Sequence, residues 1–139
     1  MTKKNQRNDP GRSANMRSIR SKDTGPEMVV RRMVHALGYR FRLHLPTLPG
    51  RPDLAFPPRH KVIEVRGCFW HQHADPNCGN ALMPSTRRDY WAPKLARNRE
   101  RDANNMNALA SMGWKTLVLW ECELADRPRI EKRIRKFLK

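Results

Sequence analysis

The sequence has few acidic residues and no long apolar run. Asp and Glu total 13 of 139 residues, against 29 Lys and Arg. The first residues, Met1-Thr2-Lys3-Lys4-Asn5, are polar and no apolar segment follows them, which argues against a secretory signal peptide. The apolar stretches are the length of strands, too short to span a membrane. These absences predict a cytoplasmic protein without a membrane partner.

Cysteine is also scarce. The chain has three cysteines, an odd number, and in a cytoplasmic protein this argues against a disulfide framework. At 139 residues the chain fits one domain with a real core. We expect a flexible basic arm over residues 1–12 and one domain over residues 13–139.

The charge is the strongest compositional signal. A formal net charge of +16 and a pI near 11.0 indicate a polyanionic partner: DNA, RNA or an anionic membrane. The basic residues are spread along the chain, and we expect no basic amphipathic helix with a strong apolar face, which disfavours the membrane. Charge alone separates neither DNA from RNA nor an enzyme from a passive binder.

Periodicity predicts an α/β protein. Thr24 and Glu27 have the spacing of a capping box, and Val30, Met33, Val34 and Leu37 then repeat at helical spacing up to Gly38. Phe41, Leu43 and Leu45 alternate with polar residues, as in a strand with one wet face. Further helices are expected over residues 13–21, 90–112 and 129–138, strands over 53–56, 61–66 and 114–120, and a long loop over 67–88. Because Pro93 fits a helix only in its first turn, the third helix is expected to begin near Trp91. This order predicts a mixed sheet covered by helices, an α/β sandwich.

An acidic pair suits phosphodiester hydrolysis. Asp53 begins one expected strand and Glu64-Val65-Arg66 ends the next, where alternation points Glu64 and Arg66 to one face. Asp53 and Glu64 could share Mg²⁺, with the carbonyl of Val65 as a further ligand and Arg66 stabilising the transition state. The alternative is two solvated acids at strand ends and a surface arginine.

The loop after this strand carries metal-ligand residue types. Cys68, His73, Cys78 and the distant Cys122 could form a closed structural zinc site that joins the loop to the last strand. Otherwise they are three buried thiols. Phe69 and Trp70 lie among polar residues and either insert between base steps of DNA or cover the zinc site. His71 could serve as a general base or acid.

These motifs, in this order, resemble the very-short-patch repair (Vsr) DNA mismatch endonucleases. The resemblance runs over roughly residues 12–124, and its segments are Asn15-Met16-Arg17, Thr24 to Glu27, Leu48-Pro49-Gly50-Arg51-Pro52-Asp53, Gly67-Cys68-Phe69-Trp70-His71, Tyr90-Trp91, Asn98 with Glu100-Arg101-Asp102, and Gly113-Trp114 through Trp120-Glu121-Cys122. It implies the restriction-endonuclease-like fold, a three-layer sandwich with a mixed central sheet and a structural zinc site.

The resemblance also implies roles. Asp53 would bind the catalytic metal, His71 would be the catalytic histidine, and Glu27 would orient metal-bound water. The DNA-binding residues would be Met16, Phe69, Trp70, Trp91, Lys94 and Asn98, the aromatics and Met16 as a wedge. The plain alternatives are core packing for Met16 and Trp91 and a solvated face for Lys94.

The activity implied is a Mg²⁺-dependent nick, 5′ to the T of a T:G mismatch left by 5-methylcytosine deamination, made by metal-activated water. The resemblance further implies a monomer in the bacterial cytoplasm, associated with the nucleoid. It implies a cytosine-5 methyltransferase system and the mismatch-repair protein MutL as partners. Two rivals remain: a restriction or nicking enzyme of the same fold acting on unmismatched DNA, and a zinc-containing DNA-binding protein without activity.

The sequence departs from the Vsr pattern at Glu64 and Arg66. Family members often have a non-acidic residue and a histidine there, so Glu-Val-Arg is closer to the acid-x-Lys pattern of nucleases in general. The spacer between His73 and Cys78 also varies among members, which leaves the histidine ligand of the zinc site open.

Overall fold

The computed structural model describes residues 24–139. The arm expected over residues 1–12, the helix expected over residues 13–21 and Met16 lie outside this part of the chain.

The first described helix, α2 (Gly25–Ala36), begins where the sequence predicts. The Thr24 hydroxyl accepts a hydrogen bond from the Glu27 N–H at 3.3 Å and so caps the first turn. Gly38, with φ +90°, follows the C-terminal end, a left-handed conformation that glycine adopts without strain. Val30 and Val34 are fully buried, which turns one face of α2 to the core.

Four strands form one mixed sheet in the order β1-β2-β3-β4, namely β1 (Arg42–Leu43), β2 (Leu54–Phe56), β3 (Lys61–Arg66) and β4 (Lys115–Trp120). The pairs β1–β2 and β2–β3 are antiparallel, and β3–β4 is parallel over its full length, from Lys61 opposite Lys115 to Arg66 opposite Trp120. The predicted mixed sheet is confirmed.

The prediction for β1 was wrong in length and in orientation. Only Arg42 and Leu43 pair, and Leu43 is 42% exposed although its alternation suggested the buried face. The backbone explains this, because His44 has φ +47° and takes the chain out of the sheet.

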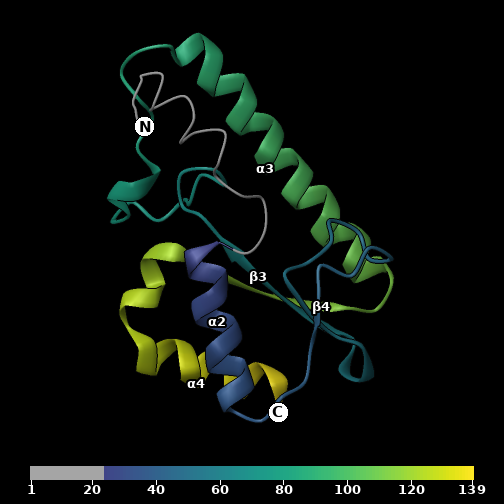
Figure 1. Ribbon diagram of the computed structural model, residues 1–139. Helices are drawn as coiled ribbons and strands as arrows, with labels where there is room; N and C mark the ends of the chain where they lie inside the picture. Colours follow the sequence, from purple (N-terminus) through teal and green to yellow (C-terminus); the bar gives the residue numbers. More distant parts are fainter. Residues whose placement is uncertain (1–23) are drawn as a thin grey trace, which may run out of the picture.

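Helices cover both faces of the sheet. Helices α2 and α4 (Arg127–Leu138) pack on one face, against Leu54, Phe56, Ile63 and Leu119. Helix α3 (Arg88–Ser111) packs on the other, where Leu109 meets Ala55 and Val62. Figure 1 shows α2 and α4 together on one side of β3 and β4, with α3 on the opposite side. The predicted α/β sandwich is therefore confirmed as a sheet between helical layers.

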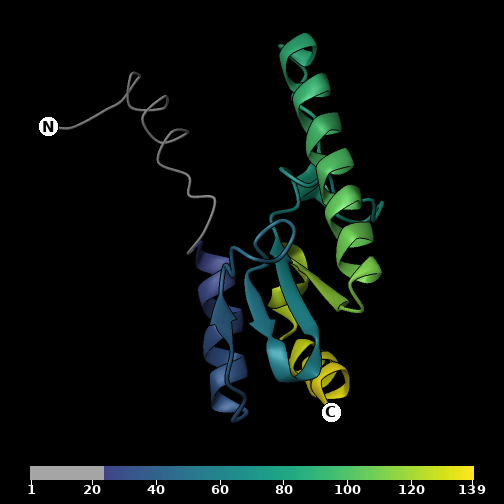
Figure 2. The same cartoon turned by 90° about the vertical axis from the view of Figure 1, so that its right-hand side faces the viewer.

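Helix α3 differs from its prediction at the N-terminal end. It begins at Arg88, so Pro93 lies inside the helix and beyond its first turn. The missing N–H of Pro93 then removes only one helical hydrogen bond near the end, which a 24-residue helix tolerates. The first half of α3 projects beyond the sheet (Figure 2) and carries Trp91, Lys94 and Asn98.

Helix α4 corrects a second expectation, that the chain holds no basic amphipathic helix with a strong apolar face. Its sequence RPRIEKRIRKFL is rich in Lys and Arg, and Ile130, Ile134 and Leu138, four residues apart, are fully buried. This apolar face belongs to the core. Among the described residues, no helix is long and apolar enough to cross a membrane.

Candidate active site and metal centre

Asp53 lies at the start of β2, beside the end of β3. Its Oδ2 atom accepts a hydrogen bond from the Val65 N–H at 2.7 Å, which fixes the carboxylate over the end of the neighbouring strand. The preceding turn contains Gly50 and Arg51, both with positive φ, and buried Pro52. The segment Gly-Arg-Pro-Asp therefore delivers Asp53 to this place through a tight, specific backbone turn.

Glu27 and His44 lie beside Asp53. The His44 Nε2 atom is 2.9 Å from Glu27 Oε2, and His44 Nδ1 is 3.9 Å from Asp53 Oδ1. One ligand atom from each of the three residues falls within 4.8 Å of the others, so the group could hold a metal ion. We name Glu27, His44 and Asp53 the carboxylate cluster. Arg31 also contacts Glu27 and lies 3.3 Å from His44.

His44 was not among the residues predicted for the site. In the sequence it reads as a polar residue on the wet face of a strand, and only its left-handed backbone turns it toward Glu27. Glu27, expected to act on water at a distance from the metal, lies directly against His44, and its side chain is almost completely buried.

The surroundings of Asp53 raise its pKa. Burial is the largest cause, and the negative charges of Glu27 and Glu64 add to it, while the Val65 N–H lowers it; together they raise the pKa from 3.8 to about 8. The cluster holds two carboxylates close together, and Arg31 compensates the charge of Glu27, so a further cation beside Asp53 is favoured. The carboxylate cluster therefore fits a divalent metal ion in chemistry as well as in distance.

Glu64 and Arg66 share one face of β3, as alternation predicts. Arg66 donates two hydrogen bonds to Glu64 Oε1, at 2.9 and 3.1 Å, and its guanidinium lies 5.7 Å from the centre of the Trp120 ring. Glu64 is close enough to Asp53 to raise its pKa but is not one of the three residues that come together as possible ligands.

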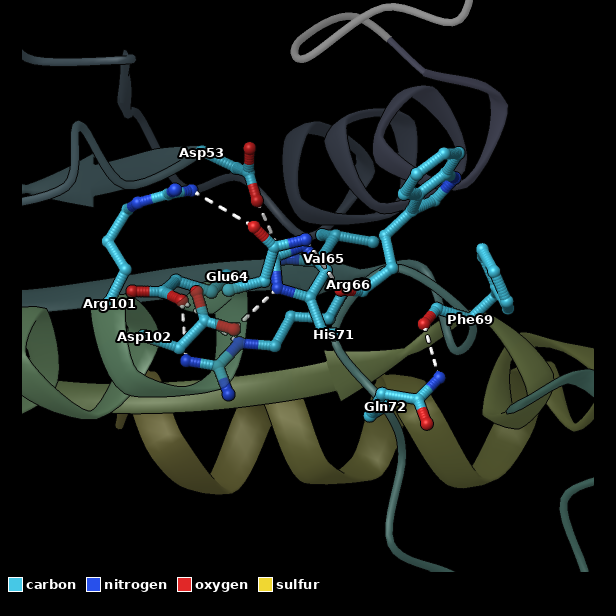
Figure 3. A network of polar contacts seen from close by, with 11 residues as sticks. Asp53, Glu64, Val65, Arg66, Phe69, His71, Gln72, Arg101 and Asp102 are labelled. Atoms are coloured by element: carbon cyan, nitrogen blue, oxygen red, sulfur yellow. Dashed lines mark hydrogen bonds and ion pairs between the residues drawn. The ribbon is translucent and has the colours of Figure 1, made fainter. Parts of the chain in front are cut away.

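His71 forms a pair with Asp102 of α3. The Nδ1 atom of His71 lies 2.6 Å from Asp102 Oδ2, and Figure 3 shows the contact beside Glu64 and Arg66. With its Nδ1 proton donated to the carboxylate, His71 keeps Nε2 as the basic nitrogen. Asp102 is a residue to which the sequence analysis gave no role; only the packing of α3 brings it to His71, 31 positions away.

Three aromatic side chains gather next to this pair. The ring centres of Phe69, Trp70 and Trp91 are 5.1 to 5.7 Å apart, and all three are partly exposed. Asn98 donates a hydrogen bond to the Trp70 carbonyl at 3.1 Å, and Gln72 donates one to the Phe69 carbonyl at 2.7 Å. The loop that carries two of the aromatics is thus held in place against α3 (Figure 3). Lys94, one turn before Asn98, is partly buried.

The four predicted zinc ligands come together. One ligand atom from each of Cys68, His73, Cys78 and Cys122 lies within 4.8 Å of the others, so this Cys/His cluster could hold a metal ion. Cys122 Sγ is 3.4 Å from His73 Nδ1, which makes His73 the histidine of the group. The His73 ring also stacks on Trp120, with ring centres 4.2 Å apart.

Two thiols of this cluster, those of Cys68 and Cys122, are poor acids without a cation. Burial and the neighbouring thiols raise the pKa of Cys122 to about 12, and burial also raises the pKa of Cys68. A metal ion reverses this, because it binds the thiolate form. The cluster joins the loop after β3 to the end of β4 at one point.

Taken together, buried carboxylates, a histidine–aspartate pair and exposed aromatics on a strongly positive chain are typical of a hydrolase that acts on nucleic acid. Comparison with known proteins agrees with this class. The family described as DNA mismatch endonuclease Vsr matches residues 5–77.

Relatives match over most of the chain. It is 49% identical over 123 residues to the type II nicking enzyme V.XorIIP of Xanthomonas oryzae, covering 88% of both chains. It is 38% identical to the DNA mismatch endonuclease Vsr of Escherichia coli, over 86% of this chain and 74% of that protein. It is 34% identical to the type II nicking enzyme V.NmeAIP of Neisseria meningitidis, over 92% and 89%. The chain belongs to the Vsr family of DNA mismatch endonucleases, as its motifs predicted, and is a DNA nuclease.

Asp53→Asn is expected to stabilise the protein at pH 8 but not at pH 4. The folded protein keeps the Asp53 proton up to a pKa of about 8, while the unfolded chain loses it near 3.8. The free energy of unfolding therefore falls as pH rises between these two values, and the asparagine variant does not share this loss. Thermal melts of both proteins across this range, with no divalent cation added, measure the difference.

The control for this experiment is Glu100→Gln, at an exposed carboxylate on α3. Its melting temperature is followed over the same pH range, and loss of solvation on folding makes no contribution at this exposed position. A constant difference for Asp53→Asn would contradict the raised pKa.

Proposed function

We propose that this protein nicks the T-bearing strand of duplex DNA on the 5′ side of a T:G mismatch, in very-short-patch repair of deaminated 5-methylcytosine. The observation that carries the proposal is the carboxylate cluster, which stands beside the His71–Asp102 pair and the aromatic group in a member of the Vsr family. Nicking is the activity named for several relatives.

The fold of this site is, by our inference, the restriction-endonuclease-like fold. The order helix, antiparallel strands, β3, helix and parallel β4 supports it. In that arrangement the acids stand at the end of β3, where a scissile phosphate can approach between α2 and the loop after β3.

The residues of the candidate active site have two kinds of role in this proposal, cation binding and proton transfer. Asp53 would hold Mg²⁺ with Glu27 and His44, and the sequence-based set of Asp53, Glu64 and the Val65 carbonyl remains the other possible ligand set. The cation would supply charge neutralisation at the phosphate and acidify water. His71, oriented by Asp102, accepts or gives a proton at Nε2, and Arg66, held by Glu64, directs positive charge toward the phosphate.

Recognition of the mismatch falls to the aromatic group. Phe69, Trp70 and Trp91 are partly exposed and already packed edge to face, so they enter a base stack as a preformed wedge with little further loss of rotamer freedom. Met16 belongs to this wedge by family position. Lys94 and Asn98, on the same helix as Trp91, would contact bases or phosphates.

The cellular setting follows from the family and is part of the proposal. We expect a monomer that acts on nucleoid DNA in the bacterial cytoplasm. A cytosine-5 methyltransferase would create the sites that later deaminate, and MutL would act as a partner.

The test is strand-labelled nicking with Mg²⁺ on three matched duplexes with T:G, C:G or T:A at one site. We expect one cut, 5′ to the mismatched T, and none in the other two duplexes. Asp53→Ala should abolish it, since the cluster loses its central carboxylate. Equal cutting of all three duplexes would instead indicate a restriction-type enzyme, and binding without any cut would indicate a DNA-binding protein.

Asp102→Asn is expected to lower the single-turnover nicking rate by about 10²- to 10⁴-fold, the usual contribution of general acid–base catalysis. The asparagine no longer stabilises the charged imidazole or fixes its tautomer. Affinity for the mismatched duplex should stay unchanged. Asp89→Asn, an exposed acid at the start of the same helix, is the matched control and should cut at the normal rate. A rate within about threefold of normal for Asp102→Asn would remove the pair from the mechanism.

The Cys/His cluster is proposed to hold one structural Zn²⁺. Three thiolates and one imidazole whose ligand atoms lie this close together form a ligand set that favours this ion. Metal analysis of the purified protein should find one zinc per chain, and Cys122→Ser should lose it. The melting temperature of that variant should fall by roughly 10 °C or more, the shift that about 3 kcal/mol produces in a domain of this size. His35→Asn, an exposed histidine outside the cluster, should keep both zinc and stability. A protein purified without zinc at full stability would refute the site.

A further inference from the structure

A basic pocket lies at the end of the sheet opposite the candidate active site. It is a cavity of about 490 Å³ with four cationic and two apolar side chains around it: Lys61, Lys115, Leu117, Arg133, Lys136 and Phe137. None of these residues belongs to the carboxylate cluster, the His71–Asp102 pair, the aromatic group or the Cys/His cluster.

The strand register separates this pocket from the active site. Lys61 and Lys115 are paired at the starts of the parallel strands β3 and β4, whereas Arg66 and Trp120 are paired at their ends. Five residue steps along a strand amount to roughly 16 Å. By strand alternation, the two lysines lie on the same face of the sheet as Ile63 and Leu117, which is the face covered by α2 and α4. Glu64 and Arg66 lie on the opposite face, which is covered by α3. The pocket is thus at the other end of the sheet from the candidate active site, and on the other face from Glu64 and Arg66.

Two of the four cations are fixed and two reach toward solvent. Lys61 donates to the Phe137 carbonyl at 2.5 Å, and Arg133 donates to Glu123 at 3.1 Å and to the Val118 carbonyl at 3.3 Å. Lys115 and Lys136 are exposed. Glu123 offsets part of this charge, and the pocket keeps an excess of positive charge held on a rigid sheet edge.

Helix α4 continues the positive charge beyond the pocket. Arg129, Lys132 and Lys136 are exposed and follow one another at intervals of three and four residues, about one helical turn or 5 Å apart. Such a row extends over roughly 10 Å, which spans about three successive phosphates of one DNA strand. The family acts on DNA, whose backbone presents negative charges at regular intervals. The regular spacing of these cations on α4 therefore favours the backbone of a nucleic acid as the partner of this surface.

We propose that the basic pocket and the exposed cations of α4 bind the phosphate backbone of a second segment of duplex DNA while the first occupies the active site. This contact takes no part in cleavage and reads no sequence, because phosphates carry none. It lets one protein hold two DNA segments and stay on DNA after it leaves a site. The proposal rests on the family's action on DNA and is independent of the T:G specificity.

The test is a capture experiment. A duplex attached to beads is saturated with the protein in the absence of Mg²⁺, and a second, fluorescent duplex without a mismatch is added. The unaltered protein should retain the second duplex. The double variant Lys115→Gln/Lys136→Gln, at two exposed positions, should lower its affinity for the second duplex by about tenfold and reduce the logarithmic salt slope of capture by roughly 2, one for each lost phosphate contact.

The matched control is Arg40→Gln/Arg42→Gln, which removes the same charge at exposed positions near the opposite edge of the sheet. This control should capture the second duplex as the unaltered protein does, and all three proteins should nick in single turnover at the same rate. Sedimentation without DNA checks that both variants have the same oligomeric state. Capture that survives in Lys115→Gln/Lys136→Gln, or an equal loss in the control, overturns the proposal. An equal loss in the control would mean that capture depends only on the overall charge of the protein.

Discussion

The parallel pairing of β3 with β4 places the Cys/His cluster at one end of the sheet and the basic pocket at the other. The two strands match residue for residue from Lys61 and Lys115 to Arg66 and Trp120. Their ends therefore lead into the loop of His71 and Cys68 and into the segment of Cys122, side by side. Their starts bring two lysines together. In a parallel pair both strands start on one side and end on the other. Here the ends carry the loop of His71 and the Cys/His cluster, and the starts carry the two lysines.

A metal ion in the Cys/His cluster would make the loop after β3 rigid. The loop after β3 has no regular hydrogen-bonding pattern except one short 3-10 turn (Gly79–Ala81), and so could adopt many conformations. A metal ion bound by Cys68, His73, Cys78 and Cys122 would fix both the position of His71 and the direction of Phe69 and Trp70. The hydrogen bonds from Asn98 and Gln72 add to this restraint. A structural metal would thus support catalysis without touching the substrate.

The sequence predicts the parts of the fold that depend on local period. The helix α2 and the strand β3 have clear periods and begin and end where expected, because caps, glycine and alternation act within a few residues. The ligand set of the Cys/His cluster is also visible, since cysteine is rare in the chain. Two features of the structure were not predicted. His44 leaves β1 through a left-handed residue, and the apolar face of α4 is hidden among its many charges.

The candidate active site shows the same limit of local reasoning. Asp53 and His71 stand out by their neighbours in sequence. Asp102 lies on α3 in the segment Glu100-Arg101-Asp102, which resembles the Vsr family but does not indicate a role for it. Its role depends on the distance of 2.6 Å to His71, which arises only when α3 packs on the sheet through Leu109 and Ala55. Glu64, by contrast, is predicted from the sequence as a metal ligand, and its Oε1 atom accepts two hydrogen bonds from Arg66.

The distribution of charge explains how a few acidic residues can act at the candidate active site of a protein whose net charge is +16. Glu27 and Asp53 are held close together away from water, which is costly for two negative charges and raises the pKa of Asp53 to about 8. The cationic surface brings a phosphate toward them, and that phosphate adds negative charge to the same place. The carboxylates and the phosphate are then both negative, and a divalent cation between them would neutralise charge on both. The scarcity of acids elsewhere keeps the DNA from being repelled before it reaches this point.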